Sequence, residues 1–390
     1  MIPDQEYSPL REAWNRFRRE KTALFALFFV AALFLTAMAA PLIANALPLL
    51  IVTGAGEWSS PALRDFFAPN VQEVFVEKIF NYLLLTALPL TVILLLFRKR
   101  KTIRHILAIL VLAAAALPFI LTGKVNDTLD YRMEYPDARI IMAPVPYGPF
   151  ATSSDICGKP SADHWFGTDQ AGRDVFARML YGSRVSLAIG FLASAISLVL
   201  GTLIGLISGY VGGKVDLLIQ RCVEIVICFP TFLLLLILMA VLLDSGSRQS
   251  VLLVILVLGC TGWSGLARLV RGEVLKQRQM QYIQACESLG VPFFRTLFVH
   301  LLPNVSGPIF VSFAFDVAGC ILAENSLSFL GFGVQIPTAS WGELLRQALD
   351  DPLAYWNLML WPGLAIFFCI CAFNFIADGM RHAIDPKTTT

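Results

Sequence analysis

Charged side chains are scarce in this sequence. Asp, Glu, Lys and Arg make up 15% of its 390 residues and 57% of the residues are hydrophobic, whereas soluble globular domains carry about 25% charged residues. The formal net charge is only +2, too small to indicate a protein that neutralises a phosphate backbone. The composition therefore predicts a membrane protein, and we expect no nucleic-acid partner.

Histidine is scarce as well, and cysteine is poorly placed for cross-linking. The four histidines are scattered, at His105, His164, His300 and His382. Of the eight cysteines, only Cys157 falls in a long polar segment. The other seven lie in or beside apolar runs: Cys222, Cys228, Cys260, Cys286, Cys320, Cys369 and Cys371. The sequence therefore predicts neither a metal site nor a disulfide framework.

A nucleotide-binding loop is missing too, although "GYVGGKVD" (209–216) partly resembles one. A Walker A loop needs Gly, four residues, Gly-Lys, and then Ser or Thr. Counting back from Gly213 puts Ser208 at the first glycine position, and Val215 replaces the hydroxyl. We expect no cofactor on this chain. The glycines instead predict a tight turn, with Asp216 capping the helix that follows.

Long apolar runs are abundant. About 20 helical residues cross the hydrocarbon core of a bilayer, and eight runs approach or exceed that length, of which the second is the shortest. They lie at about 22–45, 80–97, 103–122, 184–208, 223–243, 250–270, 305–330 and 356–377. The first run follows a basic segment and contains "AMAAPLIA", so a cleaved signal peptide is an alternative, but its apolar region is too long for one.

Lys and Arg near the span ends predict the orientation, because they favour the cytoplasmic side. They cluster in residues 11–21, in the tight loop 98–104 and in the loop 268–295, whereas 333–356 leans acidic. These assignments agree with eight crossings and both termini in the cytoplasm. The predicted fold is an all-α polytopic membrane protein.

The chain divides into three predicted parts. Residues 1–50 form a basic amphipathic helix that runs into the first span. Residues 51–160 hold outside segments and a hairpin of two spans, and residues 161–390 hold five spans with compact connections. The outside stretch 123–182 is expected to have little regular structure before its last residues.

An unusual polar stretch, "YIQACESLGVPFFRTLFVHLLPN" (282–304), lies between two apolar runs. A helix from about 264 to 289 is predicted to stop at Gly290, which tolerates left-handed backbone. Pro292 suits the first turn of a second helix. The apolar residues of that helix share one face: Phe293, Leu297 and Leu301, with Phe294 and Phe298 beside them. Such a helix can lie on lipid headgroups or dock in a groove of another protein.

The spacing of this stretch resembles the EAA loop of ABC importer permeases, whose general form is E-A-A-x3-G-x9-I-x-L-P. The matching positions are Gln284, Ala285, Cys286, Gly290, His300, Leu302 and Pro303. Gln284 replaces the usual Glu and Cys286 the second Ala, which puts a salt bridge at position 284 in doubt. The resemblance implies that residues 273–304 form a coupling loop, with Phe294 and Phe298 in its second helix, that docks on an ATP-hydrolysing subunit.

Four more segments resemble the C-type permeases of dipeptide and oligopeptide importers, and most closely those of the microcin C/peptide type. They begin "AWNRFRREKTALF", "HWFGTDQAGRD", "GYVGGKVDLLIQ" and "ENSLSFLGFG". Residues 51–160 match no known motif, and their hairpin departs from the usual six spans. The resemblance implies an ABC importer type I permease core in the cell inner membrane. It also implies a B-type permease partner, ATP-binding subunits that hold ATP and Mg²⁺, and an extracytoplasmic solute-binding protein.

Three glycines, Gly201, Gly205 and Gly209, recur every four residues along the fourth span. Small residues at this spacing allow close helix contact in a membrane. We favour a contact within the chain over a dimer face.

Two acids, Asp316 and Glu324, fall within the seventh span. Acids inside a membrane border a polar pathway or bond to neighbouring helices. The two interpretations are even for Asp316, whereas for Glu324 we favour a structural role at the outer gate. An ion-coupled secondary transporter that uses Asp316 is the alternative function, although no repeat is visible. The segment "GTDQAGRD" could hold a catalytic carboxylate pair, Asp169 and Asp174, but an interfacial helix near the gate is favoured.

Overall fold

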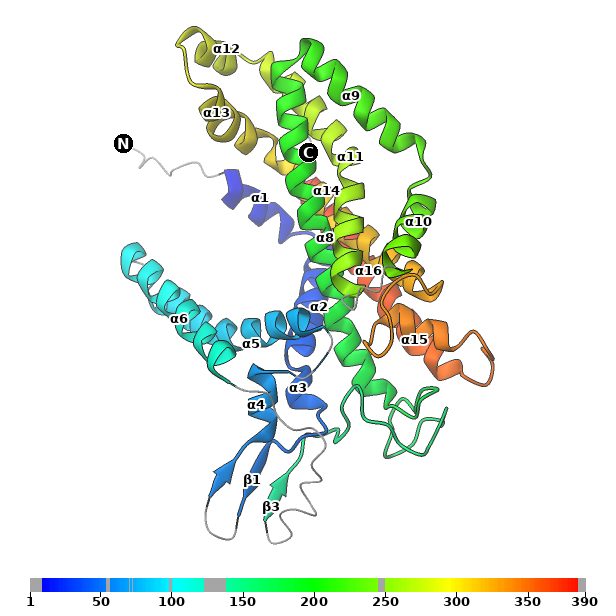
Figure 1. The fold of residues 1–390 in the computed structure, drawn as a ribbon. Coiled ribbons are helices and arrows are strands. Elements are labelled where there is room, and N and C mark those ends of the chain that lie inside the picture. The colour runs from blue at the N-terminus through cyan, green and yellow to red at the C-terminus, as the bar shows by residue number, and fades with distance from the viewer. Residues whose placement is uncertain are drawn as a thin grey trace. The chain divides into compact units, whose positions relative to one another are not determined.

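The computed structural model describes residues 9–53, 57–69, 71, 73–97, 100–122, 138–244 and 250–384 (Figure 1). The helices before the sheet's last strand are α1 (Pro9–Phe17), α2 (Lys21–Met38), α3 (Ala40–Ile43), α4 (Pro61–Phe67), α5 (Val74–Leu96) and α6 (Lys101–Leu121). Those after it are α8 (Val175–Val211), α9 (Gly213–Cys228), α10 (Thr231–Asp244), α11 (Ser250–Arg278), α12 (Gln281–Ser288), α13 (Phe293–Arg295), the π-helix η1 (Thr296–Leu301), α14 (Leu302–Phe329), α15 (Trp341–Gln347) and α16 (Trp356–Ile384). The strands are β1 (Leu50–Val52), β2 (Trp58–Ser59) and β3 (Arg139–Ile141).

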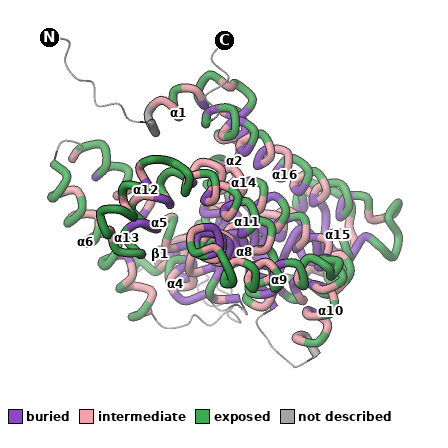
Figure 2. Tube along the Cα trace, turned by 90° about the horizontal axis from the view of Figure 1, so that it is seen from above, coloured by how far each residue is buried: buried purple, intermediate pink, exposed green. Residues whose placement is uncertain are grey.

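Seven helical stretches among the described residues are long and apolar enough to cross a membrane: α2, α5, α6, α8, α11, the run Phe293–Phe329 and α16. The bent pair α9–α10 makes eight if it counts as one broken span. The prediction of an all-α polytopic membrane protein with about eight spans is thereby confirmed. The extra hairpin is present as α5 and α6, which pack against each other, and Figure 2 shows mainly exposed and intermediate residues along α6.

The apolar run predicted at 223–243 is bent in the structure. The chain bends by 80° between α9 and α10, where Phe229 takes an extended conformation with φ −84° and ψ 133°. Pro230 explains the break, because proline disfavours helical backbone in the residue before it and has no N–H to donate. The second span also begins earlier than predicted, at Val74.

A small antiparallel sheet takes its strand β3 from the outside stretch 123–182, for which the sequence predicts little regular structure. Its strand order is β2-β1-β3, and Ile51 of β1 pairs with Ser59 on one side and Ile140 on the other. Ile51 is buried, so it gives the sheet an apolar contact. Strands of two or three residues are too short to show an alternating pattern in the sequence.

The described chain forms two compact units that interleave along the sequence. The first unit contains residues 1–31, 189–333 and 365–390, and the second contains 32–188 and 334–364. The three parts predicted along the sequence are not tested by this division and stay a prediction. The first unit holds the 282–304 stretch, and the second holds the sheet and the extra hairpin.

Candidate functional site

The 282–304 stretch leaves α11 through a turn that the sequence does not predict. α11 ends at Arg278 and α12 starts at Gln281, whereas one continuous helix was expected up to Leu289. Met280 is extended there, with ψ 144°. The turn directs Ile283 into an apolar cluster of the first unit, where it is fully buried. This burial is the physical reason for the break.

Gly290 ends α12 in the conformation that its sequence position predicts. Its φ is +69°, in the left-handed region that glycine adopts without strain. The Gly290 N–H donates to the Glu287 carbonyl at 3.1 Å, and the Val291 N–H donates to the Cys286 carbonyl at 3.0 Å. These two bonds form a Schellman motif, which satisfies the last carbonyls of the helix.

The second helix of the stretch differs from the separate short helix that the sequence predicts. Pro292 stands just before α13 as its N-cap, not within its first turn. α13 continues through η1 into α14, and the Leu302 N–H donates to the carbonyl of Leu297, five residues back. This wider π turn lies directly before Pro303, which has no N–H to donate. The run Phe293–Phe329 is therefore one helical element.

One side of the stretch is anchored in the first unit. Leu297 and Leu301 are buried with Ile283 in a single cluster. Its buried members are Leu206, Leu266, Val270, Val274, Ile283, Leu297, Leu301, Val305 and Ile309. Phe293, predicted on the same face, is 39% exposed, but its ring lies 5.5 Å from that of Tyr210. The cluster connects the stretch to α8, α11 and α14.

The other side exposes large apolar side chains. Leu289 is 80% exposed, Phe294 71% and Phe298 42%. We call these three residues the apolar face of the stretch. Phe294 and Phe298 are four residues apart in one helical run and therefore share a side, and exposed apolar groups on an anchored segment mark an interaction surface.

The remaining EAA-like positions lie on the same segment. Gln284 and Ala285 are exposed and Cys286 is half-buried, and α12 lies against η1. The Gln284 Nε2 donates to the Gln279 carbonyl at 3.4 Å, so this side chain stays with its own turn. His300 and Leu302 are half-buried and Pro303 is exposed. The predicted loop residues thus lie on one short segment that spans α12, η1 and the start of α14, and their coupling role stays a prediction.

Tyr282 is a residue of this segment that the sequence analysis missed. Its hydroxyl donates to Gln277 Oε1 at 2.9 Å, across the turn between α11 and α12. Partial burial against the cluster raises the pKa of Tyr282. No sequence signal beyond an aromatic residue in a polar turn indicated it.

Asp216 forms an ion pair with Arg271 instead of the helix cap that the sequence predicts. The N-cap of α9 is Gly212, with φ +70°, so Asp216 does not cap that helix. Asp216 instead accepts two bonds from Arg271 of α11, each 2.6 Å long, and one from Ser208 of α8. A planar guanidinium fits a carboxylate in this two-bond geometry. The pair fixes α8, α9 and α11 together.

The three glycines of α8 face α11. A Cβ at Gly201 would lie 2.9 Å from Leu266 Cβ, one at Gly205 2.7 Å from the Ala267 oxygen, and one at Gly209 2.8 Å from Val274 Cβ. Side chains do not fit at such distances. The structure therefore places the glycine row at a helix contact within the chain.

The two intramembrane acids have different surroundings. Glu324 is fully buried, and its Oε1 accepts a bond from Ser328 Oγ at 2.8 Å, one turn along α14. Asp316 is half-buried, and its Oδ2 is buried with no hydrogen-bond partner in the described part of the chain. Their predicted roles at a pathway or gate stay predictions.

The "GTDQAGRD" segment forms a buried ionic network in the second unit. Arg173 Nε lies 2.7 Å and Arg178 Nε 3.2 Å from Asp169 Oδ2. Arg178 also donates to Glu343 of α15 at 2.5 Å. Asp174 accepts from the Ala177 N–H at 2.7 Å and thereby caps the start of α8. Both carboxylates are held by cations or backbone, which fits the favoured structural role over a catalytic pair.

These features define a class: a polytopic membrane protein with a short, anchored connecting segment that presents an apolar face. Residues 201–390 match the family described as binding-protein-dependent transport system inner membrane component, and residues 8–51 match the N-terminal TM domain of oligopeptide transport permease C. The chain belongs to this family of inner-membrane permease components. The resemblance drawn from the sequence is confirmed, as is the inner-membrane location.

Relatives cover much of the chain. A dipeptide transport system permease protein, DppC, of Bacillus subtilis is 42% identical over 229 residues, which are 58% of this chain and 70% of the relative. An oligopeptide transport system permease protein, OppC, of Haemophilus influenzae is 41% identical over 57% of this chain and 70% of the relative. A putative peptide transport system permease protein of Brucella abortus is 35% identical over 296 residues, 74% of this chain and 90% of the relative.

Proposed function

We propose that this permease subunit lines part of the translocation pathway for peptides or peptide-like solutes and is driven by ATP hydrolysis on a separate subunit. The single observation that carries the coupling is the 282–304 stretch, which is buried on one side and apolar and exposed on the other. The peptide class rests on the relatives, whose names are dipeptide, oligopeptide and glutathione transport permeases.

The geometry supports a mechanical role for the stretch. A protein that contacts Phe294 and Phe298 pushes on a helix that continues unbroken to Phe329. Leu297 and Leu301 transmit the same push to α8 and α11 through the apolar cluster. Closure of the ATP-binding subunits would thus tilt the spans between inward-open and outward-open states. ATP and Mg²⁺ are held by that partner.

The proposal includes three kinds of partner. A B-type permease supplies the other half of the pathway, ATP-binding subunits contact the apolar face, and an extracytoplasmic solute-binding protein delivers the solute. The ion-coupled alternative relies on Asp316, whose Oδ2 is unpartnered among the described residues, and no relative supports it.

Co-purification with the ATP-binding subunits of the same transport system tests the docking. We expect Phe294→Asp to abolish stoichiometric co-purification, because it puts a charge into an apolar contact that is desolvated on docking. Leu353→Asp is the matched control, since Leu353 is 89% exposed on a loop of the second unit and its substitution should leave the complex intact. Equal recovery of the ATP-binding subunits with both variants would refute docking at this face.

A further inference from the structure

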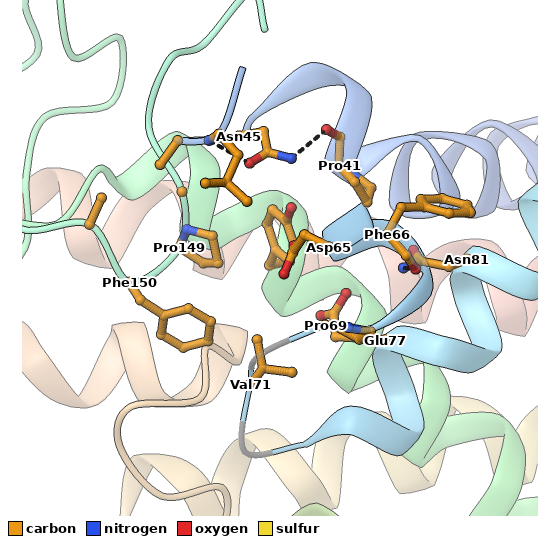
Figure 3. Close-up of a pocket in the computed structure, with 15 residues that line it drawn as sticks. Pro41, Asn45, Asp65, Phe66, Pro69, Val71, Glu77, Asn81, Pro149 and Phe150 are labelled. Carbon is orange, nitrogen blue, oxygen red and sulfur yellow. Dashed lines mark hydrogen bonds between the residues drawn. The ribbon is translucent and has the colours of Figure 1, made fainter. Parts of the chain in front are cut away.

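A pocket in the second unit has no role in the coupling described above. Its volume is about 320 Å³, within the range of small-molecule sites. It is formed by α3, α4, the start of α5, the 148–151 loop and α8. Most of its wall comes from residues 51–160, the part of the chain for which the sequence indicates no function. Figure 3 shows its lining residues.

The described lining of the pocket contains acids and no basic residue. Two carboxylates, Asp65 and Glu77, line it, and none of the described lining residues is Lys, Arg or His. Figure 3 shows both acids between the Phe66 side and the Phe150 side of the pocket.

The buried side chain of Arg184 holds Glu77 in place. Glu77 forms an ion pair with buried Arg184 through its Oε2. Arg184 also donates to the carbonyls of Ala37 and Met38, at 2.6 and 2.8 Å. The Arg184 ion pair engages Oε2 and fixes the Glu77 side chain, so Glu77 Oε1 can accept a further bond.

Asn81 supplies a second, independent sign of a ligand. Its side chain is 2% exposed and lines the pocket. The Nδ2 donates to the Phe66 carbonyl at 2.7 Å, but the Oδ1 has no hydrogen-bond partner among the described residues. A buried acceptor without a donor is unfavourable, and a donor carried by a ligand would satisfy it.

We propose that this pocket binds a primary ammonium group. An ammonium carries three N–H donors and one positive charge. The donors match the Asn81 and Glu77 oxygens, and the charge matches a lining with two carboxylates against one paired cation, Arg184. Two sources offer this chemistry on the side that the sequence predicts as outside. One is the free amino group of a soluble peptide or amino acid, and the other is the ethanolamine headgroup of a phospholipid. The inference does not depend on which solute the permease carries.

Binding to the full-length protein in nanodiscs tests the proposal. For a soluble source, we expect the dipeptide Ala-Phe to bind in calorimetry and its N-acetylated form not to bind. For a lipid source, we expect native mass spectrometry to show retained phosphatidylethanolamine, and no retention of phosphatidylcholine, whose methylated nitrogen has no N–H.

Two variants assign the binding to the pocket. Asp65→Asn should weaken whichever ligand binds by at least about 10-fold, because a charge-assisted contact is lost. Glu57→Gln is the matched control, since Glu57 is exposed in the same part of the chain and outside the pocket. If neither free-amine probe is preferred over its blocked partner, or if Asp65→Asn binds as the wild type does, the proposal is overturned.

Discussion

At the scale of single residues, the packing of α8 on α11 in the first unit depends on three glycines, Gly201, Gly205 and Gly209. The row of glycines on α8 lets the backbone of α11 approach to a distance that a methyl group would prevent. Membrane helices associate through such close packing, because lipid provides no hydrophobic drive between them. The anchored segment at 282–304 sits on the same cluster, so this contact also positions the proposed coupling surface.

Gly205→Ala should destabilise the protein. The added Cβ would lie 2.7 Å from the Ala267 oxygen and 2.7 Å from Val270 Cβ, and overpacking of this kind costs about 1–3 kcal/mol. Thermal unfolding in detergent measures the effect. Gly265→Ala is the control, because a Cβ there meets nothing within 4 Å, and its midpoint should stay level or rise. Similar midpoints for both variants would contradict the packing described for α8.

Sequence spacing could indicate the glycine row but not the ion pair beside it. Three glycines at intervals of four define a helix face by themselves. Asp216 and Arg271 are 55 positions apart, and only the packing of α9 on α11 brings them together. The same limit applies to Arg184 and Glu77, whose contact spans 107 positions.

At the scale of elements, the hairpin of α12 and α13 depends on one left-handed residue. Gly290→Ala should strain it by roughly 1–2 kcal/mol, since Ala rarely adopts positive φ. A Cβ at this position meets nothing within 4 Å, so the backbone alone is the cause. Hydrogen exchange of the α12 amides should accelerate.

Gly290→Asn separates this cause from a general effect of size. Asn tolerates the left-handed region, so its exchange rates should stay near those of the wild type although its side chain is larger. An Ala variant that exchanges as slowly as the Asn variant would show that the Schellman turn does not control the hairpin.

Element boundaries were predictable where one residue acts locally, and less so where packing decides. Gly290 gave the end of α12 directly. Pro230 carried the signal for the break between α9 and α10, but the apolar run around it concealed that signal. The turn at Met280 exists because Ile283 becomes buried, and the β-sheet joins residues far apart in the chain. Neither is encoded in a local pattern.

At the scale of the whole molecule, the family and the number of spans followed from the sequence, because motif spacing and apolar length survive substitution. Motif spacing and apolar length did not predict the structure of residues 51–160. The strands and the pocket of this part of the chain are evident only from the folded structure. An added segment on an established permease core is consistent with a function that the core lacks.

Peptide uptake into proteoliposomes that contain the complete transporter tests the central claim most directly. With solute-binding protein present, uptake should require ATP, persist when the proton gradient is dissipated, and be lost in the Phe294→Asp variant. The Asp316→Asn variant should keep its dependence on ATP. Uptake that proceeds without the ATP-binding subunits and follows the proton gradient would contradict the account.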